Sequence, residues 1–127
     1  MLSDGTIDFD GIKNTVTPST KLVEIQRSKG YEYRPSLSIE TVEKIIKIVK
    51  SINPNIICMV DNCYCEFVDT IEPTEVGADL IVGSLIKNPG GGLAPIGGYI
   101  CGTAACIEQC AYRLSAPGLG QEVGASL

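Results

Sequence analysis

The stretch DLIVGSLIKNPGGGLAPIGGYICG, residues 79–102, decides the expected fold. It begins with an apolar run at 79–84 that is typical of a buried strand, and a second strand is expected over 95–102. Between them stands a single lysine, Lys87, directly before an Asn-Pro pair and three glycines. Open α/β sheets bind ligands in the loops just beyond their strands, so this segment predicts both a sheet and a site.

The sequence on the N-terminal side adds further elements. NIICMV at 55–60 is another short apolar run and predicts a second buried strand, with Asp61 directly after it. KLVEIQ at 21–26 is a candidate strand. Ser38 is suited to cap a helix over about 39–52, where six apolar residues recur at helical spacing: Ile39, Val42, Ile45, Ile46, Val49 and Ile52.

The remaining segments complete an alternation of strands and helices, which predicts an α/β fold with a mostly parallel sheet and flanking helices. We expect a short helix or turn at 7–16, a short helix at 72–78, a helix at 103–114, and a glycine-rich tail at 115–127 with no core of its own. Residues 63–68 fit no one type of element. Because nothing closes the fold after the last helix, we expect the chain to be a piece of a longer protein.

Composition excludes some classes of function. The net charge of −5 argues against a nucleic-acid surface, which needs a basic patch. The longest apolar runs, such as IICMV, are too short to span a bilayer. The acidic first residues have no apolar core of a secretory signal, so a cytoplasmic location is expected.

The six cysteines leave two interpretations open: Cys58, Cys63, Cys65, Cys101, Cys106 and Cys110. In a reducing cytoplasm a disulfide framework is not expected, and the thiols are then mostly small buried side chains. The alternative is a metal or redox centre. No CxxC pair occurs, so the spacing is not that of a zinc ribbon or finger, and no metal site is predicted.

Polar side chains gather just beyond the predicted strands. Arg27 and Ser28 follow the first strand, Asp61 and Tyr64 follow the second, and Ser84 and Lys87 follow the third. The carboxyl ends of parallel strands share one edge of the sheet, so these side chains are expected on one rim. Two plainer interpretations stay open, since Asp61 could merely cap a turn and Lys87 could merely be solvated.

The known phosphate-binding motifs do not explain Lys87. No Gly-Lys-Ser/Thr follows the glycines as a P-loop requires, and GGGLAPIGG precedes a strand where a dinucleotide motif opens a helix. A lysine and an acid at neighbouring strand ends instead suit pyridoxal phosphate. The amine can form a Schiff base with its aldehyde, and the acid can pair with its pyridine nitrogen. Desolvation beside a buried strand is expected to lower the pKa of the lysine and make its amine nucleophilic.

The segment 60–102 resembles the lysine-bearing part of the methionine gamma-lyase-like family, often called aluminium resistance proteins, among the fold type I pyridoxal-phosphate enzymes. The resemblance is most specific in SLIKNPGGGLAPIGGY, and IQRSKGYEYRPSLSIE and YRLSAPGLGQEVGASL extend it over nearly the whole chain. It implies that 1–127 is the C-terminal half of a pyridoxal-phosphate-binding large domain. The rest of that domain and a small domain would then lie outside this sequence.

The resemblance also implies a role for each candidate residue. Lys87 is implied as the Schiff-base lysine, Asp61 as the partner of the pyridine nitrogen, and Ser84 as a phosphate ligand. Tyr64 is similar to the phenol that contacts the ring oxygen in many aminotransferases. Arg27 and Ser28 stand in the loop that approaches the ring or the substrate. Cys65 occupies a position where the family pattern leads us to expect glycine, so its side chain could crowd the turn that aims Tyr64.

The function implied is a carbon–sulfur lyase that carries out β- or γ-elimination on a sulfur-containing amino acid such as methionine, cysteine or cystathionine. The resemblance further implies a homo-oligomer, dimer or tetramer, when full length, and an isolated chain that is inactive. The alternatives are an aminotransferase or decarboxylase with the same cofactor, a small cysteine-rich metal or redox protein, and a truncated product without catalysis. No nucleic-acid or membrane partner is expected.

Overall fold

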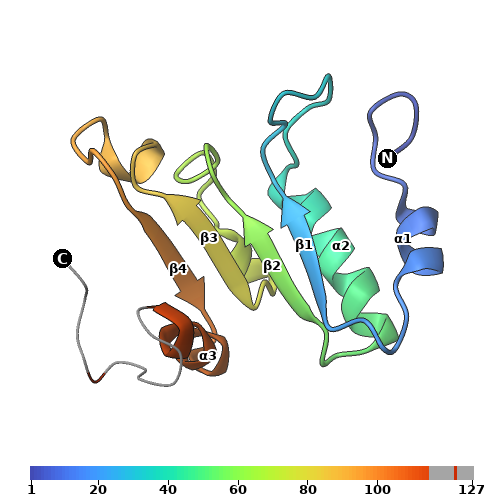
Figure 1. Cartoon of the computed structure of the whole chain (residues 1–127). Coiled ribbons are helices and arrows are strands. Elements are labelled where there is room, and N and C mark those ends of the chain that lie inside the picture. Colours follow the sequence, from blue (N-terminus) through green and yellow to red (C-terminus); the bar gives the residue numbers. More distant parts are fainter. Residues whose placement is uncertain (115–121, 123–127) are drawn as a thin grey trace.

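The computed structural model describes residues 1–114 and residue 122, so the predicted tail lies almost wholly outside the described residues. Its centre is a four-stranded sheet in the order β1-β2-β3-β4, seen face-on in Figure 1. The first three strands are parallel and β4 is antiparallel to β3, which confirms the predicted α/β fold with a mostly parallel sheet. The strands are β1 (Leu22–Gln26), β2 (Ile57–Asp61), β3 (Leu80–Ser84) and β4 (Gly98–Gly102).

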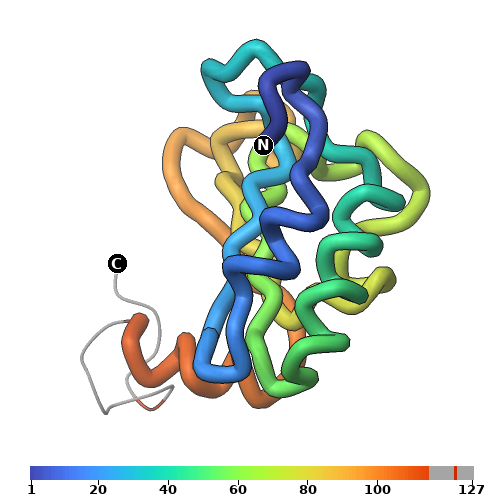
Figure 2. Tube along the Cα trace, turned by 90° about the vertical axis from the view of Figure 1, so that its right-hand side faces the viewer, coloured from blue at the N-terminus to red at the C-terminus, as the bar shows by residue number. Residues whose placement is uncertain are grey.

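The helix predicted by apolar periodicity over 39–52 is present, and the segments expected at 7–16 and 103–114 are also helical. They are α1 (Phe9–Thr15), α2 (Ile39–Ile52) and α3 (Ala104–Leu114), with short 3₁₀ turns η1 (Pro73–Val76) and η2 (Asn88–Gly90). α1 and α2 pack against each other beside β1, and α3 lies at the far end of the sheet below β4 (Figures 1 and 2). The chain therefore forms a two-layer arrangement in which α2 covers one face of the sheet.

The amphipathic stripe of α2 builds the core. The hydroxyl of Ser38 accepts a hydrogen bond from the Thr41 amide at 3.3 Å, which confirms the predicted cap and fixes where the helix begins. All but one residue of the predicted stripe are buried against the sheet, and only Ile52 is partly exposed. The core consists of Ile25, Val42, Ile45, Ile46, Val49, Ile56, Cys58, Val60 and Ala78.

The pleat of the strands separates a covered face from an open one. In β2, Cys58 and Val60 point toward α2 and belong to the core. Successive side chains alternate, so Met59 and Asp61 point to the opposite face, where they are only half-buried. The register pairs Asp61 with Val82, which places Ser84, two residues further along β3, on that same open face.

Several predicted boundaries differ from the structure. Asp61 is the last residue of β2 and not the first residue after it, because it still pairs with both neighbouring strands. β4 begins at Gly98, three residues later than expected. The helix expected over 72–78 is a single 3₁₀ turn, with Gly77 left-handed at its end. The undecided residues 63–68 form turns.

Within the described residues no helix has both the length and the apolar character needed to cross a membrane.

Truncating a core side chain tests the packing of α2. Ile45 is 4% exposed, so Ile45→Ala is expected to lower the free energy of unfolding by about 2–5 kcal/mol. Lys47 lies on the wet face of the same helix in an exposed ion pair with Glu43, and Lys47→Ala should cost about 1 kcal/mol or less. Urea denaturation followed by circular dichroism measures both. Equal losses for the two variants would contradict this assignment of the buried face.

Candidate functional site at the carboxyl edge of the sheet

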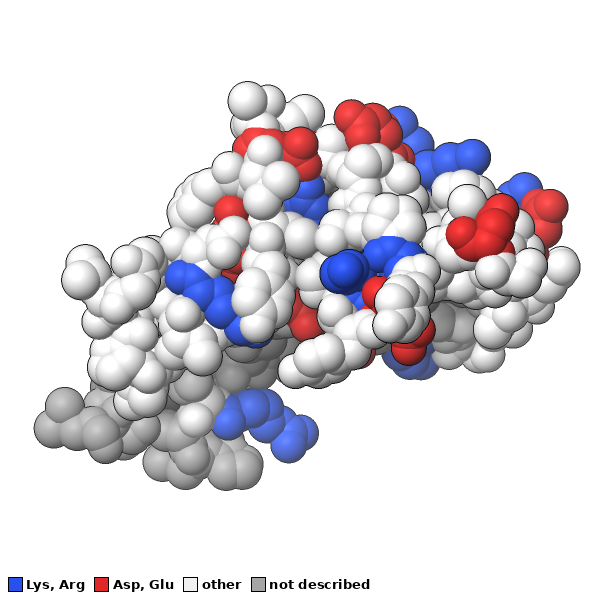
Figure 3. Space-filling model, turned by 90° about the horizontal axis from the view of Figure 1, so that it is seen from above, with Lys and Arg blue, Asp and Glu red and all other residues white. Residues whose placement is uncertain are grey.

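The carboxyl ends of β1, β2 and β3 meet at one edge, at the top of Figure 1. The loops that follow these strands form the surface seen in Figure 3, where acidic and basic side chains are interspersed. Asp61 ends β2 and Ser84 ends β3, and both lie on the open face of the sheet. The sequence therefore predicts correctly that these two side chains are brought to one edge.

Lys87 and Tyr64 meet in space although they come from different loops. The ammonium nitrogen of Lys87 lies 4.3 Å from the centre of the Tyr64 ring, within the range of a cation–π interaction. Tyr64 reaches this position from the turn after β2, where its φ of 69° is left-handed. A tyrosine rarely adopts that conformation, so the surrounding loop has to hold it there.

The charge state of Lys87 differs from the expectation. Partial desolvation does lower its pKa, but Cys63, Tyr64 and Asp61 together outweigh it and raise the pKa above the ordinary value. The prediction of a lowered pKa is therefore wrong for the chain by itself. Lys87 stands at a half-open edge, where water still solvates the ammonium, and Cys63, followed by Tyr64 and Asp61, stabilises the charged form.

Asp61 uses one carboxylate oxygen within the protein. Its Oδ1 accepts a hydrogen bond from the amide of Cys63 at 3.0 Å, so it does cap the following turn, as the plainer interpretation has it. The same carboxylate makes the smallest of the contributions that raise the pKa of Lys87, after those of Cys63 and Tyr64. Capping a turn and facing a cationic ligand are compatible, because a carboxylate has several acceptor positions.

Arg27 is buried beneath the rim and not exposed in it. Only 2% of its surface is accessible. Its guanidinium donates to Asn62 Oδ1 at 3.0 Å, to the carbonyl oxygens of Cys65 and Leu37, and to the carboxylate of Asp69. Glu72 Oε2 also lies 3.9 Å from Nη1 of the guanidinium. With its donors used inside the protein, Arg27 holds the loop after β2 in place.

Ser28 and Cys65 are also buried. Ser28 is 8% exposed, and its carbonyl accepts a hydrogen bond from Arg34 at 2.6 Å. Cys65 is 5% exposed and has an ordinary backbone conformation, whereas Tyr64 and Phe67 have positive φ. The side chain of Cys65 is thus buried within the turn, and the residue with the strained backbone is Tyr64 itself.

The glycine run after Lys87 makes a tight turn. Gly91 and Gly92 have φ of 54° and 80°, which glycine adopts at little cost. A Cβ on Gly90 would come within 1.8 Å of the Leu85 carbonyl oxygen, so that position admits no side chain. These glycines fold the chain back toward β4 and fix the turn in which Lys87 stands.

The cysteines are less buried than predicted. Only Cys58 and Cys65 are buried, while Cys63, Cys106 and Cys110 are half-buried and Cys101 is exposed; all six are free thiols. Burial raises the pKa of Cys58 to about 11, which keeps this thiol protonated and unreactive at neutral pH. Over residues 1–114 and residue 122, no three cysteine or acidic side chains gather as a set of metal ligands.

Three residues beneath the rim were missed by sequence reasoning, namely Glu66, Glu72 and Tyr99, while Asn62 was expected only as a residue just beyond the second strand. Asn62 donates to Glu72 at 2.8 Å, and the hydroxyl of Tyr99 donates to Glu66 at 2.9 Å. One signal was available in Gly83, since a glycine inside a buried strand often marks the close approach of another group. The aromatic ring of Tyr99 is that group.

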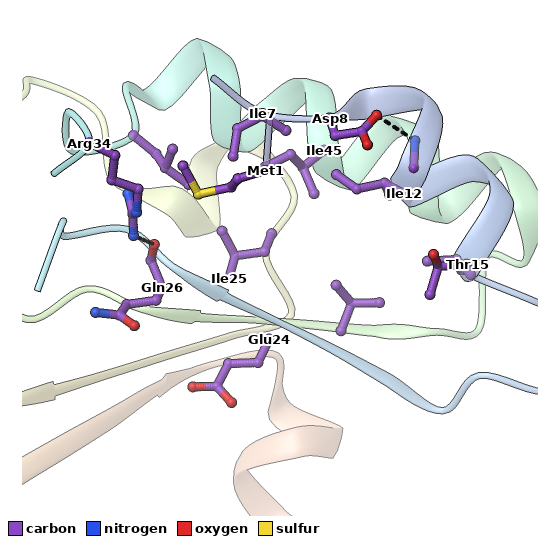
Figure 4. Close-up of a pocket in the computed structure, with 14 residues that line it drawn as sticks. Met1, Ile7, Asp8, Ile12, Thr15, Glu24, Ile25, Gln26, Arg34 and Ile45 are labelled. Carbon is purple, nitrogen blue, oxygen red and sulfur yellow. Dashed lines mark hydrogen bonds between the residues drawn. The ribbon is translucent and has the colours of Figure 1, made fainter. Parts of the chain in front are cut away.

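A hollow within the described residues lies away from this edge. A cavity of about 510 Å³ opens between α1, β1 and α2, and its lining is largely apolar (Figure 4). Two of its polar groups are engaged within the fold, since Asp8 accepts from the Gly11 amide and Arg34 donates to the Gln26 carbonyl. The candidate site is the edge that carries Lys87, where an amine, a carboxylate and a hydroxyl come together.

The set of polar groups at this edge fits pyridoxal phosphate. It comprises an amine at Lys87, a carboxylate at Asp61 and a hydroxyl at Ser84, with the phenol of Tyr64 beside the amine. These are the groups that an aldehyde, a pyridine nitrogen, a phosphate and a ring oxygen respectively require. The individual roles stay predictions.

Comparisons with known proteins agree with the resemblance. The sequence profile of the methionine gamma-lyase family matches residues 1–127. An uncharacterized Bacillus subtilis protein, YnbB, is 56% identical over 127 residues, which are all of this chain and 30% of the relative. An uncharacterized Lactobacillus delbrueckii protein is 44% identical over 125 residues, 98% of this chain and 41% of the relative.

Solved structures are similarly close. A Listeria innocua protein that carries the provisional name cystathionine beta-lyase involved in aluminum resistance has a TM-score of 0.94 and 57% identity, covering 100% of this chain and 31% of that chain. A carbon-sulfur lyase involved in aluminum resistance from Clostridium novyi has a TM-score of 0.88 and 52% identity, covering 96% and 29%. The chain thus spans about a third of the length of these relatives.

Removing the buried guanidinium tests its structural role. Arg27→Met would leave the carboxylates of Asp69 and Glu72 without their cation, and we expect a loss of about 3–5 kcal/mol in the free energy of unfolding. Arg113→Met, on the exposed α3, is the matched control and should change stability by about 0.5 kcal/mol or less. If chemical denaturation gives the same stability for both variants, Arg27 does not organise the loop.

The raised pKa of Lys87 predicts slow acylation. Because the pKa lies above the ordinary value, the ammonium form persists to higher pH, and Lys87 should react with acetic anhydride more slowly than the exposed Lys29 at the same pH. Tyr64→Leu removes the ring and should speed the reaction about two- to fivefold. Competitive labelling analysed by mass spectrometry over a pH series measures this. A slower reaction in Tyr64→Leu would contradict the assigned cause.

Proposed function

We propose that this chain, which belongs to the methionine gamma-lyase family, is the lysine-bearing part of a pyridoxal-phosphate-dependent carbon–sulfur lyase. The observation that carries the proposal is the position of Lys87. Its ammonium lies over the Tyr64 ring at the carboxyl edge of the sheet, with Asp61 and Ser84 at the ends of the adjacent strands. The names of the two solved relatives favour a lyase over an aminotransferase or decarboxylase.

Each rim residue has a distinct task in this proposal. When bound, the cofactor supplies an aldehyde for covalent attachment and a ring that accepts the electrons of a substrate carbanion. Lys87 provides the amine for attachment and carries protons to and from the substrate. Asp61 keeps a proton at the pyridine nitrogen, and Ser84 donates a hydrogen bond to the phosphate. Tyr64 orients the amine and holds a phenol beside it.

Arg27 and Ser28 have a different task from the rim residues. Both are buried, and the guanidinium of Arg27 donates hydrogen bonds to the loop that carries Tyr64. In the proposal they act as positioning residues below the cofactor and do not contact it through their side chains. Ser28 fixes the loop after β1 through its carbonyl bond with Arg34.

The raised pKa of Lys87 bears on how the amine would be activated. In the chain alone the amine is held as an ammonium by its neighbours. A nucleophilic amine needs a drier setting, and desolvation already acts on Lys87 in that direction. Covering the open edge with more protein would exclude water from Lys87, and this stronger desolvation would lower the pKa of its amine. This is consistent with relatives about three times as long as this chain.

The proposal for the whole protein is broader. It includes β- or γ-elimination on a sulfur-containing amino acid, a homo-oligomer, a cytoplasmic location, and a domain of which 1–127 forms only a part. Because the chain spans only about 30% of its relatives, we propose that it is inactive by itself.

A borohydride trap tests the cofactor assignment. The chain is incubated with pyridoxal phosphate, reduced and digested, and the pyridoxyl group is located by mass spectrometry. We expect the label at Lys87, its loss in Lys87→Arg, and weaker labelling in Asp61→Asn because the pyridine nitrogen loses its partner. Lys29→Arg is the control and should leave the label in place.

The distribution of the label decides the outcome. Selective reaction at Lys87 supports a cofactor site at this edge. Labelling spread evenly over Lys13, Lys44, Lys47 and Lys50, which lie on the exposed sides of α1 and α2, would show that Lys87 has no special affinity for the cofactor.

A further inference from the structure

A single glycine in β3 lets a side chain of β4 lie over the backbone of β3. Gly83 of β3 is paired with Tyr99 of β4, and a Cβ on Gly83 would lie 2.3–2.4 Å from atoms of the Tyr99 ring. The ring therefore lies directly against the backbone of β3, where any other residue would displace it. From there the Tyr99 hydroxyl donates a hydrogen bond to Glu66 Oε1 at 2.9 Å. Glu66 belongs to the loop after β2, and β2 is two strands away from β4 in the sheet.

Glu66 is held from a second side by the turn that carries the lysine. Its backbone carbonyl accepts a hydrogen bond from the side-chain amide of Asn88 at 3.0 Å. Asn88 directly follows Lys87, and Glu66 comes two residues after Tyr64. One residue thus connects β4, the turn of Lys87 and the loop of Tyr64.

Packing alone does not account for a carboxylate at this place. Glu66 is 4% exposed, and its second oxygen, Oε2, is buried and has no hydrogen-bond partner within the described residues. A half-paired buried carboxylate costs stability. It also accepts a stronger hydrogen bond than a neutral amide does, which favours a fixed Tyr99–Glu66 contact. Burial and the neighbouring Glu66 carboxylate raise the pKa of Tyr99, so the phenol remains a donor.

We propose that Glu66, Asn88 and Tyr99, named here the Glu66 clamp, are positioning residues that keep the Tyr64 ring beneath the amine of Lys87. The clamp acts from the covered face of the sheet, because Tyr99 is paired with Gly83 while Asp61 and Ser84 point to the open face. Its catalytic meaning rests on the proposed function of Lys87. Its geometry does not, because the contact between Tyr64 and Lys87 joins two residues of this chain directly.

The position of Lys87 can be read from a ring-current shift. Reductive methylation with ¹³C-formaldehyde places a labelled methyl reporter on each lysine, and Lys87→Arg identifies the signal of Lys87 by its disappearance. A methyl group above the Tyr64 ring resonates upfield, and Tyr64→Leu defines the position without the ring. We expect Tyr99→Phe, which removes only the hydroxyl, to move the Lys87 signal most of the way to that position.

Two further variants separate positioning from folding. Glu66→Gln keeps an acceptor for the Tyr99 hydroxyl and should retain most of the shift. Tyr31→Phe removes a hydroxyl from a fully exposed tyrosine and should leave the shift unchanged. Circular dichroism confirms that each variant is folded. If Tyr99→Phe does not fold, Asn88→Ala decides instead, because it releases the turn and leaves the packing of Tyr99 on Gly83 intact.

An unchanged Lys87 signal in folded Tyr99→Phe, or in folded Asn88→Ala where that variant decides, overturns the clamp. So does a wild-type signal that already coincides with that of Tyr64→Leu. The cofactor assignment fails separately: if the ring-current pattern is as expected but the borohydride label avoids Lys87, the clamp stands and the proposed function does not.

Discussion

The buried guanidinium of Arg27 is the interaction on which the rest of the site depends. Arg27 is the first residue after β1, and its backbone amide still bonds to Asp61 of β2 at 3.0 Å. Its side chain continues below the rim to Asn62, Cys65 and Asp69. Burying a cation is costly unless every donor finds an acceptor. The loop after β2 supplies three of those acceptors, at Asn62, Cys65 and Asp69, so the need to pair the guanidinium holds this loop in its observed arrangement.

The fixed loop explains how Tyr64 can hold a left-handed backbone. An isolated turn would relax away from this conformation, which costs about 1–3 kcal/mol for a residue other than glycine. Here the preceding Asn62 and the following Cys65 are both tied to Arg27, so the strain is borne by a network that is already in place. The outcome is a phenol ring presented to the turn after β3, where Lys87 meets it.

Much of the fold is predictable because local physical rules decide it. The apolar stripe of 39–52 and the cap at Ser38 determine α2, and the short apolar runs determine β2 and β3. Parallel strands then carry Asp61 and Ser84 to one edge. Element boundaries and the antiparallel direction of β4 depend on pairing between strands, which no single segment of sequence reveals.

The part of the site that was not predictable is non-local and polar. The burial of Arg27 depends on acceptors up to 42 positions away, and the contact between Tyr99 and Glu66 spans 33 positions. The sign of the pKa shift at Lys87 likewise depends on Cys63, Tyr64 and Asp61, which come from the end of β2 and the loop that follows it. A sequence pattern shows that a lysine follows a buried strand, but it does not show what surrounds the amine.

The most direct test of a cofactor site at this edge is a crystal structure of a chimaera. The matched third of the Bacillus subtilis relative would be replaced by residues 1–127, and the protein would be crystallised after incubation with pyridoxal phosphate and reduction with borohydride. The account predicts electron density that continues from the Lys87 amine into the ring, with Asp61 at the pyridine nitrogen and Ser84 at the phosphate. A pyridoxyl group on another lysine, or a ring nitrogen turned away from Asp61, would contradict it.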